Sequence, residues 1–388
     1  MKVAYVDHAG DIGGGAQEAL LDILRYVDRN RVRPLLFHAE RAEWLRGVDL
    51  DGIACREVFP AGGALYEHSR EQVAGFTTRI IGALQSVGPV SRLRKTITEL
   101  DPDIIHTNTL KCHVLGGFAA RFSRKPLVWD VRDILPPGGA RNLLVRVARV
   151  VRPHIVAMSQ AVADSLADAH CDTTVVLGAR PLDKYEPVAR DPVLAAELQL
   201  PPDAPVLAVI ARLTPWKGHR VLLRAMPEIL SRHPDTCLLV IGDTGFWEDD
   251  YKQELHTLAE EMGCAHAVRW LGFREDVQQL LALTDIVVLP SDTEPFGMVL
   301  IEAMAAGKPV IATRAAGPME IVNDGETGLL VPIGDAGALA EAACTLLADP
   351  TRAGQMGRAG RARAEEMFDI SRLVEQLYGV YDSLSGAG

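Results

Sequence analysis

Short apolar runs that alternate with helical patterns are the feature that most constrains the fold of this chain. Each run is long enough for a buried strand and too short for a helix, and amphipathic stretches at 16–27, 221–230 and 277–283 separate several of them. Strands that alternate with helices form parallel sheets covered on both faces. The runs fall into two sets and therefore predict two Rossmann-like α/β domains, with strands near 3–6, 35–37, 104–105, 127–128, 155–157 and 175–177, and near 206–210, 238–241, 268–271, 286–289, 310–312 and 329–331.

The domain boundaries follow from where the periodicity stops. The segment 179–205 is rich in Pro, Asp and Arg and lacks a clear period, so we expect an N-terminal domain over 1–185 and a C-terminal domain over 186–370. We expect the last segment, 371–388, to be a helix that packs back on the N-terminal domain. Open parallel sheets bind ligands beyond the carboxyl ends of their strands, so the two domains should face each other across a cleft.

Composition excludes several classes of protein. A chain of 388 residues with 48% hydrophobic and 23% charged residues is globular and long enough for two cores. Its formal charge of −11 argues against a nucleic-acid partner, which would need a basic surface. The start has no signal-like apolar segment and no run could cross a bilayer, so we expect a cytoplasmic protein. The six cysteines form no C-x-x-C pair and the histidines have no metal-binding spacing, so no metal site is expected.

The stretch from 285 to 334 carries the densest chemical signal. A buried strand at 286–289 leads into a polar turn, then EPFG, then a helix that begins at Met298 and ends before Gly307. The first turn of a helix has free backbone N–H groups, and the helix dipole also favours negative charge there. The sequence therefore predicts an anion site around Phe296, Gly297, Met298 and Val299.

Two acids flank this anion site. Glu294 lies in the loop before the helix, and Glu302 lies about one turn inside it. Carboxylates would repel a phosphate, so we expect these acids to accept hydrogen bonds from sugar hydroxyls while the amides hold a diphosphate. The alternative is that both acids only interact with the helix dipole.

The stretch resembles a known family at this point. Glu294 and Glu302, with seven residues between them, occur with EPFG, AMAAGKPVIAT and DGETGLLVP, and this pattern resembles the family 4 retaining glycosyltransferases of the GT-B fold. The resemblance covers nearly the whole chain, is strongest over 206–332 and is weakest over 47–94. It implies a transferase that uses a nucleoside diphosphate sugar and retains the configuration of the sugar.

Further residues of the second half fit this interpretation. RLTPWKG places Arg212 and Lys217 after a strand, where two cations suit a diphosphate leaving group; surface cations are the alternative. Gly242 and Gly245 resemble the family's second glycine loop, although Thr244 interrupts the usual Gly-Asp-Gly. Phe273 and Arg274 follow the next strand, where relatives hold the base largely through backbone atoms.

The first half offers a glycine turn at GGG, residues 13–15. Glycines let the backbone approach a ligand, but Glu18 breaks the dinucleotide fingerprint G-x-G-x-x-G, which argues against a nicotinamide oxidoreductase. The resemblance implies that Gly14 and Gly15 lie near the donor phosphates and the acceptor. A turn without a ligand is the alternative.

The acceptor side is predicted from two strand ends. His106 and Asn108 end one strand, and Arg132 and Asp133 follow another. Many relatives have a histidine where Arg132 aligns. Arginine cannot act as a base near neutral pH, so Arg132 should clamp a phosphate or carboxylate; an Arg132–Asp133 pair that fixes the loop is the alternative. His106 could equally be a structural histidine.

Two other patterns allow competing interpretations. Residues 140–153 predict an amphipathic helix. Its apolar side consists of Leu143, Leu144, Val147, Val150 and Val151, and its basic side of Arg141, Arg146, Arg149 and Arg152. Such a helix either packs on the sheet or makes peripheral contact with the inner face of a membrane. Asp101 and Asp103 match the D-x-D of metal-dependent transferases, but lie in a helix-to-strand loop, so we expect no metal there.

We therefore predict a metal-independent glycosyltransferase with a UDP or GDP sugar as co-substrate and no cofactor. Its acceptor hydroxyl would belong to a cell-surface polysaccharide, a glycolipid or a secondary metabolite. A nucleotide-sugar epimerase of the same architecture and a non-catalytic partner subunit are the alternatives. The nucleotide, the sugar, the acceptor and the oligomeric state do not follow from the sequence.

Overall fold

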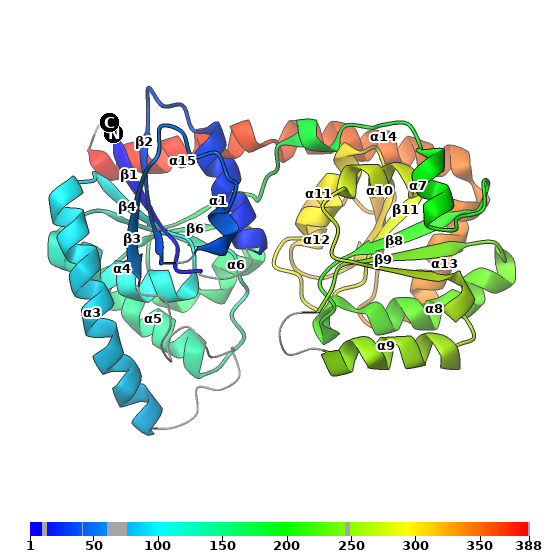
Figure 1. Ribbon diagram of the computed structural model, residues 1–388, viewed down its shortest axis with the longest axis horizontal. Helices are drawn as coiled ribbons and strands as arrows, with labels where there is room; N and C mark the ends of the chain where they lie inside the picture. Colours follow the sequence, from blue (N-terminus) through cyan, green and yellow to red (C-terminus); the bar gives the residue numbers. More distant parts are fainter. Residues whose placement is uncertain (10–13, 41, 60–75, 245–248, 387–388) are drawn as a thin grey trace. The chain divides into compact units, whose positions relative to one another are not determined.

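The computed structural model describes residues 1–9, 14–40, 42–59, 76–244 and 249–386. The chain forms two compact units, Met1–Leu177 with Leu373–Gly388, and Gly178–Arg372 (Figure 1). The chain enters the second unit once, leaves it once, and then returns to the first. The boundaries predicted from the sequence lie at 185/186 and 370/371, within eight residues of these.

The first unit is built on a seven-stranded parallel sheet with strand order β3-β2-β1-β4-β5-β6-β7. Six of these strands include or overlap the predicted apolar runs. The edge strand β3 was missed because only its last two residues, Val58 and Phe59, are buried. The strands are β1 (Lys2–Val6), β2 (Arg33–Ala39), β3 (Ala54–Phe59), β4 (Ile104–Thr107), β5 (Leu127–Val131), β6 (His154–Ala157) and β7 (Thr173–Val175).

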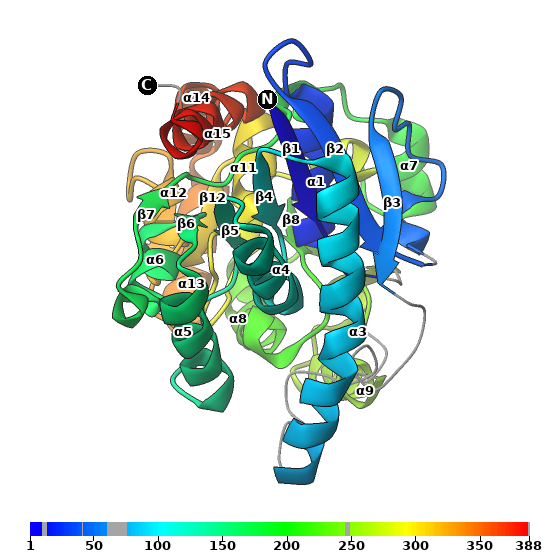
Figure 2. The ribbon, with the colours of Figure 1, turned by 90° about the vertical axis from the view of Figure 1, so that its left-hand side faces the viewer.

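Helices cover both faces of this sheet. Figure 2 shows α4 lying between α3 and α5 on one face, in agreement with the contacts between these helices. The last helix, α15, contacts the segment after α1, where the backbone N–H of Asp28 donates to the hydroxyl of Tyr378 at 2.6 Å. The helices of this unit are α1 (Gly15–Tyr26), α3 (Phe76–Leu100), α4 (Leu110–Ser123), α5 (Gly139–Val151), α6 (Gln160–Ser165) and α15 (Ile370–Ser385), whose first three residues are counted with the second unit.

The second unit contains a six-stranded parallel sheet with strand order β10-β9-β8-β11-β12-β13. Its strands are β8 (Val206–Ile210), β9 (Cys237–Ile241), β10 (Val268–Gly272), β11 (Ile286–Leu289), β12 (Val310–Thr313) and β13 (Gly328–Val331). Its helices are α7 (Pro192–Glu197), α8 (His219–Arg232), α9 (Asp249–Glu261), α10 (Val277–Leu283), α11 (Met298–Ala305), α12 (Pro318–Ile321), α13 (Ala336–Ala348) and α14 (Pro350–Met367).

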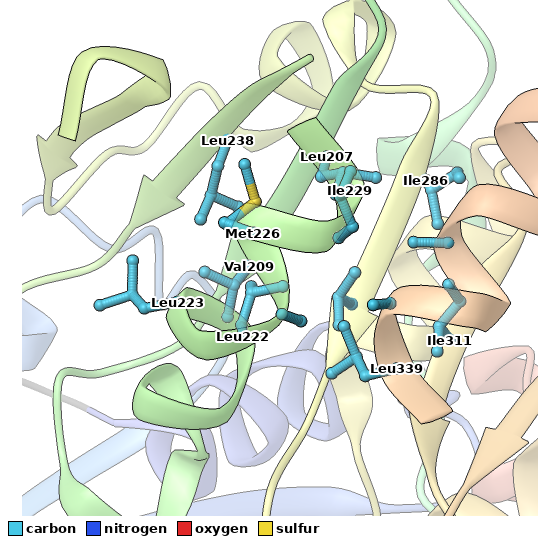
Figure 3. Packing of buried hydrophobic residues seen from close by; sticks show 14 of the residues in the cluster. Leu207, Val209, Leu222, Leu223, Met226, Ile229, Leu238, Ile286, Ile311 and Leu339 are labelled. Atoms are coloured by element: carbon cyan, nitrogen blue, oxygen red, sulfur yellow. The ribbon is translucent and has the colours of Figure 1, made fainter. Parts of the chain in front are cut away.

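Alternate residues of each strand pack on opposite faces of this sheet. Leu207 and Val209 join a cluster with Met226 of α8 and Leu339 of α13 (Figure 3). Val206 and Ala208 instead join a second cluster with Leu194, Leu280 and their neighbours from α7 and α10. Because both faces are buried, the strands read as continuous apolar runs rather than as alternating patterns. Full burial of one such leucine contributes about 1.5–3 kcal/mol.

The strand order reverses once in each sheet, between β1 and β4 and between β8 and β11. Chain segments leave the sheet in opposite directions at such a point, and a crevice opens beyond the carboxyl ends of the strands. Asp7 and Asn108 follow β1 and β4, whereas Arg212 and Glu294 follow β8 and β11. The topology therefore gathers most of the predicted site residues at these two edges.

Candidate functional site

The loop between β11 and α11 is held in one shape by a glycine and by hydrogen bonds. Gly297 adopts φ +107°, a left-handed conformation, and caps the start of α11. The hydroxyl of Thr313 donates to the carbonyl of Ser291 at 2.6 Å, and the N–H of Gly317 donates to the carbonyl of Glu294 at 3.1 Å. The amides of Met298 and Val299 thus begin a helix at the carboxyl edge of the sheet, as an anion site requires.

Glu294 lies in direct contact with Lys217. The Lys217 ammonium is 2.6 Å from Oε2 of Glu294, and the hydroxyl of Ser291 donates to the same oxygen at 3.1 Å. The Lys217 nitrogen also lies 4.2 Å from the centre of the Trp216 ring, a cation–π distance. An acid and a cation predicted from separate motifs are therefore neighbours, and Ser291 and Trp216 join them without having been predicted.

The Lys217 loop approaches β11 very closely. The short helix η4 (Pro215–Lys217) ends at Gly218, where φ is +75°. A Cβ atom on Gly218 would lie 1.9 Å from the carbonyl oxygen of Pro290, so only glycine fits here. The N–H of Asp292 also donates to the carbonyl of Trp216 at 2.8 Å. These contacts fix the position of Lys217 relative to Glu294.

Arg212 and the second glycine loop lie beside β8. Arg212 is exposed, and no partner of its guanidinium is found among the described residues. Gly242 adopts φ +132°, and a Cβ atom there would lie 2.1 Å from the carbonyl oxygen of Ala211. The nearby Asp243 carboxylate pairs with Lys252 at 2.8 Å. Gly245, the other predicted glycine of this loop, lies outside the described residues, as does Gly13 of the N-terminal turn.

Phe273 and Arg274 follow β10. The Phe273 side chain is 70% exposed, which leaves its ring available to stack on a planar group. The Arg274 guanidinium is engaged by Asp276, with Nε 2.7 Å from Oδ1. The N–H of Gly242 donates to the carbonyl of Gly272 at 2.8 Å, so this loop and the second glycine loop are joined.

Glu302 pairs with Arg180, a residue that was not predicted as part of the site. Nε of Arg180 donates to Oε1 of Glu302 at 2.8 Å, and both side chains are buried. Arg180 comes from the segment that follows β7, 122 residues before Glu302 in the chain. This segment contained no periodic or motif signal from which the contact could have been predicted.

Two of the predicted acceptor residues of the first unit, His106 and Arg132, meet at Asp130. Nη2 of Arg132 donates to Oδ2 of Asp130 at 2.6 Å, and Nε2 of His106 lies 3.4 Å from the same oxygen. Burial acts to raise the pKa of Asp130, but Arg132 and His106 outweigh it and hold the pKa at about 2. Asp130 is therefore ionised at neutral pH. Asp130 was not among the predicted site residues, and Asp133 is partly buried nearby.

His106 also contacts the C-terminal helix. Its Nδ1 lies 2.8 Å from the Tyr381 hydroxyl, which donates to the Tyr5 hydroxyl at 3.3 Å. All three side chains are fully buried, and burial raises the pKa of Tyr5 and of Tyr381 above the ordinary range. A series of buried side-chain contacts thus connects Tyr381 of α15 to Arg132 through His106 and Asp130. No local pattern could have linked Tyr5 to Tyr381.

Asn108 belongs to a second buried group in this unit. Oδ2 of Asp7 accepts hydrogen bonds from Nδ2 of Asn108 at 2.9 Å and from Nε2 of Gln17 at 3.0 Å. Oε1 of Gln17 in turn accepts from the N–H of Gly14 at 3.0 Å, which fixes the start of α1. Among the described residues, a Cβ atom on Gly15 would meet nothing within 4 Å.

Helix α5 differs from the amphipathic helix that was predicted. Leu143 and Val150 are 57% and 59% exposed, so they do not share the buried side with Leu144, Val147 and Val151. Two of the arginines are engaged in the unit: Arg141 donates to Asp168 at 2.7 Å, and Arg149 donates to the carbonyl of Asp168. The buried face of α5 is narrower than the predicted apolar side. A stripe of Leu143, Arg146 and Val150 is therefore exposed.

The D-x-D acids have structural partners. Asp101 pairs with Lys125 at 2.6 Å, and Asp103 accepts a hydrogen bond from the N–H of Lys2 at 2.6 Å. Within the described residues, no group of three or more His, Cys, Asp or Glu side chains has metal-binding geometry. In the same part of the chain, no helix combines the length and apolar character needed to span a bilayer.

Two family models match the chain, one in each half. Residues 13–177 match the model described as glycosyltransferase family 4, and residues 192–363 match glycosyl transferases group 1. Among solved structures, the Anabaena protein HepE in complex with UDP and glucose aligns with a TM-score of 0.83 and 29% identity, over 99% of this chain and 100% of that protein.

Two curated relatives match over shorter regions. The lipopolysaccharide core biosynthesis glycosyltransferase LpsE of Rhizobium meliloti is 36% identical over 180 residues, which are 46% of this chain and 50% of the relative. A GDP-mannose-dependent phosphatidylinositol monomannoside mannosyltransferase of Mycolicibacterium smegmatis is 39% identical over 190 residues, 46% of this chain and 48% of the relative. The chain thus spans about half the length of the curated relatives it matches.

Proposed function

Because this chain belongs to the family 4 glycosyltransferases of the GT-B fold, we propose that it transfers a sugar from a nucleoside diphosphate sugar to an acceptor hydroxyl with retention of configuration. The observation that carries the proposal is the contact of Lys217 with Glu294 at the carboxyl edge of the second sheet. This contact places a cation that can stabilise the leaving group next to an acid that can bind sugar hydroxyls.

The diphosphate is held by Arg212, Lys217 and the amides from Gly297 to Val299. Negative charge on the leaving diphosphate grows as the glycosidic bond breaks, and fixed cations and helix amides stabilise that charge. These groups supply the stabilisation that a metal ion gives in other transferases, so the proposed reaction is metal-independent. Glu294 binds the sugar hydroxyls, and Glu302 binds the ribose.

The acceptor hydroxyl attacks the face from which the diphosphate departs. The sugar passes through an oxocarbenium-like state, and the departing phosphate oxygen takes the proton of the acceptor. Glu294 is engaged by Lys217 and Ser291, which supports a role in binding rather than as a nucleophile.

The donor nucleotide is UDP or GDP. The aligned Anabaena structures contain UDP or UDP-glucose, and the mannosyltransferase relative is named for GDP-mannose. The exposed Phe273 ring and the loop at Gly272 provide a place for the base, with Gly242 beside them.

The acceptor carries an anionic group next to its hydroxyl. Arg132 is fixed by Asp130, and the planar guanidinium of an arginine suits a phosphate or carboxylate. Several relatives are named D-inositol 3-phosphate glycosyltransferases, whose acceptor name includes such a group. His106, Asn108 and Asp133 complete the acceptor side.

The protein acts at the inner face of a membrane in polysaccharide or glycolipid synthesis. The exposed Leu143–Arg146–Val150 stripe of α5 supports this location, since apolar and basic side chains together favour anionic lipid surfaces. In vesicle sedimentation, wild type should bind vesicles containing phosphatidylglycerol at low salt, and L143D/V150D should not. No binding of wild type at low salt would refute the membrane contact.

The decisive experiment is turnover with UDP-glucose and GDP-mannose, with and without a panel of phosphorylated and lipid-linked acceptors. A transferase forms a glycosylated acceptor only when both substrates are present, and EDTA leaves the rate unchanged. An epimerase would convert the donor alone, which NMR of the donor detects. A non-catalytic partner subunit would bind nucleotide, detected as a raised melting temperature, without any turnover.

A further inference from the structure

Arg180 occupies an unusual place in the second unit. It lies in the segment that enters this unit, and its N–H donates to the carbonyl of Phe368 at 3.0 Å while its carbonyl accepts from the N–H of Ile370 at 3.0 Å. The segment that leaves the unit therefore fixes the Arg180 backbone from both sides, in a parallel bridge with Asp369. Such a fixed backbone gives the side chain a defined starting point.

The same two segments pack against Phe296, in the loop between β11 and α11. A Cβ atom on Gly178 would lie 2.6 Å from the Phe296 ring, and the Phe368 ring packs edge-on against Phe296 with centroids 5.9 Å apart. Phe296 is only 1% exposed. The position of Arg180 is thus tied by packing to the loop that starts α11.

From this fixed position, the Arg180 side chain reaches Glu302 of α11. Its Nε donates to Oε1 of Glu302, which is 7% exposed. A carboxylate with one oxygen held by a guanidinium cannot rotate freely, so the direction of its second oxygen is set. That second oxygen, Oε2, remains to accept a hydrogen bond.

We propose that Arg180 is a positioning residue for nucleotide recognition: it orients Glu302 so that Oε2 accepts from the ribose hydroxyls of the donor. The inference rests on the proposed function, in which Glu302 binds the ribose. Arg180 itself does not touch the nucleotide. Its contribution appears only when the ligand has ribose hydroxyls.

A purely structural ion pair would behave differently. Loss of Arg180 would then weaken every nucleotide by the same factor, because it would act through folding of the whole loop. If Arg180 instead positions Glu302, its loss weakens the binding only of nucleotides that have ribose hydroxyls. Comparison of a ribonucleotide with its dideoxy analogue therefore separates the two roles.

The experiment measures affinities by calorimetry for whichever of UDP and GDP binds wild type more tightly, and for its 2′,3′-dideoxy analogue. Arg180→Ala should weaken the ribonucleotide about tenfold, the scale of one hydrogen bond to a charged group, and leave the dideoxy analogue unchanged. Arg180→Lys should restore part of the loss. Equal weakening of both ligands by Arg180→Ala, or no weakening of either, overturns the proposal.

Controls separate this inference from the function on which it rests. Arg363→Ala removes another partly buried arginine of the same unit, one that donates to the carbonyl of Ile321 at 2.7 Å, and should not change the ratio of the two affinities. Because a ratio is measured, partial unfolding cancels. If Arg180→Ala does not fold, Glu302→Gln and R180K/E302Q replace it. The double variant should then bind the ribonucleotide no more weakly than Glu302→Gln does. A wild type that binds neither nucleotide refutes the function; a wild type that binds with an unchanged ratio in Arg180→Ala refutes only the inference.

Discussion

The carboxyl edges of the two sheets share a topology but use their charged residues differently. In the first unit, Asp130 is engaged by Arg132 and His106, and the network continues to a buried tyrosine pair. In the second unit, Lys217 pairs with Glu294, while Arg212 extends to solvent. Each edge therefore holds one cation in an ion pair, and the second edge also presents Arg212, an exposed cation, to solvent.

The largest expected effect is a loss of stability when the buried network of the first unit is broken. Asp130→Ala leaves the Arg132 guanidinium nearly buried without its partner, and loss of one member of such a pair costs about 3–5 kcal/mol of stability. Chemical denaturation of the purified protein measures this. Asp168→Ala, which removes an exposed carboxylate from Arg141, should cost no more than about 1 kcal/mol. Equal costs for the two variants would contradict the contrast between buried and exposed pairs.

The next effect tests the cation that pairs with Glu294 in the second unit. Lys217→Ala should lower donor turnover about 10²- to 10³-fold, because a positioned donor to the leaving group is lost. Steady-state rates at saturating donor measure it. The control is Lys125→Ala, whose lysine pairs with Asp101 in a helix-to-strand loop. Turnover of Lys217→Ala within about threefold of wild type, well short of the expected loss, would remove Lys217 from the leaving-group role.

The same contrast explains what the sequence could predict. The donor edge is encoded in short local motifs, so the strand, the glycine turn, Glu294, Glu302, Arg212 and Lys217 are all visible in 212–217 and 285–305. The alternation of apolar runs also predicted both parallel sheets, apart from the half-exposed edge strand β3. These features depend on neighbours in sequence.

Contacts between distant segments could not be predicted. Tyr381 meets His106 across 275 positions and Arg180 meets Glu302 across 122, and neither pair belongs to a motif. The exposure of Leu143 and Val150 was also missed, because a helical period gives the direction of a stripe but not how much of it the neighbouring helices cover. Packing, rather than local pattern, determines these features.

A third prediction compares buried histidines. Both ring nitrogens of His219 are buried without a hydrogen-bond partner among the described residues, whereas His113 of the first unit contacts the Thr107 hydroxyl at 2.7 Å. Burial, with Lys217 adding to it, lowers the pKa of His219 to about 4. Between that value and about 6.5, the unfolded chain binds a proton that the folded chain does not, so stability falls as pH drops through this window.

His219→Leu should therefore remove about 3 kcal/mol of the acid-induced loss and cost little at pH 7, because no hydrogen bond is broken. Melting temperatures at neutral pH and near pH 4.5 measure this. His170→Asn changes an exposed histidine and should leave the pH dependence as it is. A wild-type pH dependence in His219→Leu would show that His219 does not carry the effect.

The smallest effect probes the far end of the buried network. Tyr381→Phe removes one hydroxyl that contacts His106 and Tyr5, and should cost about 1 kcal/mol, since the ring and its packing remain. Chemical denaturation measures it beside Tyr26→Phe, whose ring is 40% exposed. A cost as large as that of Asp130→Ala would mean that the network fails as a whole when any member is lost.

The return of α15 to the first unit has a consequence for synthesis on the ribosome. Tyr5 and His106 are made early, but Tyr381 emerges only after all of Gly178–Arg372 has been translated. At about 5–20 residues per second, the incomplete first unit waits on the order of ten seconds or more, while the second unit can already fold. The nascent chain must therefore hold an open core during that interval, and chaperones that shelter it should matter more for the earlier half than for the later one.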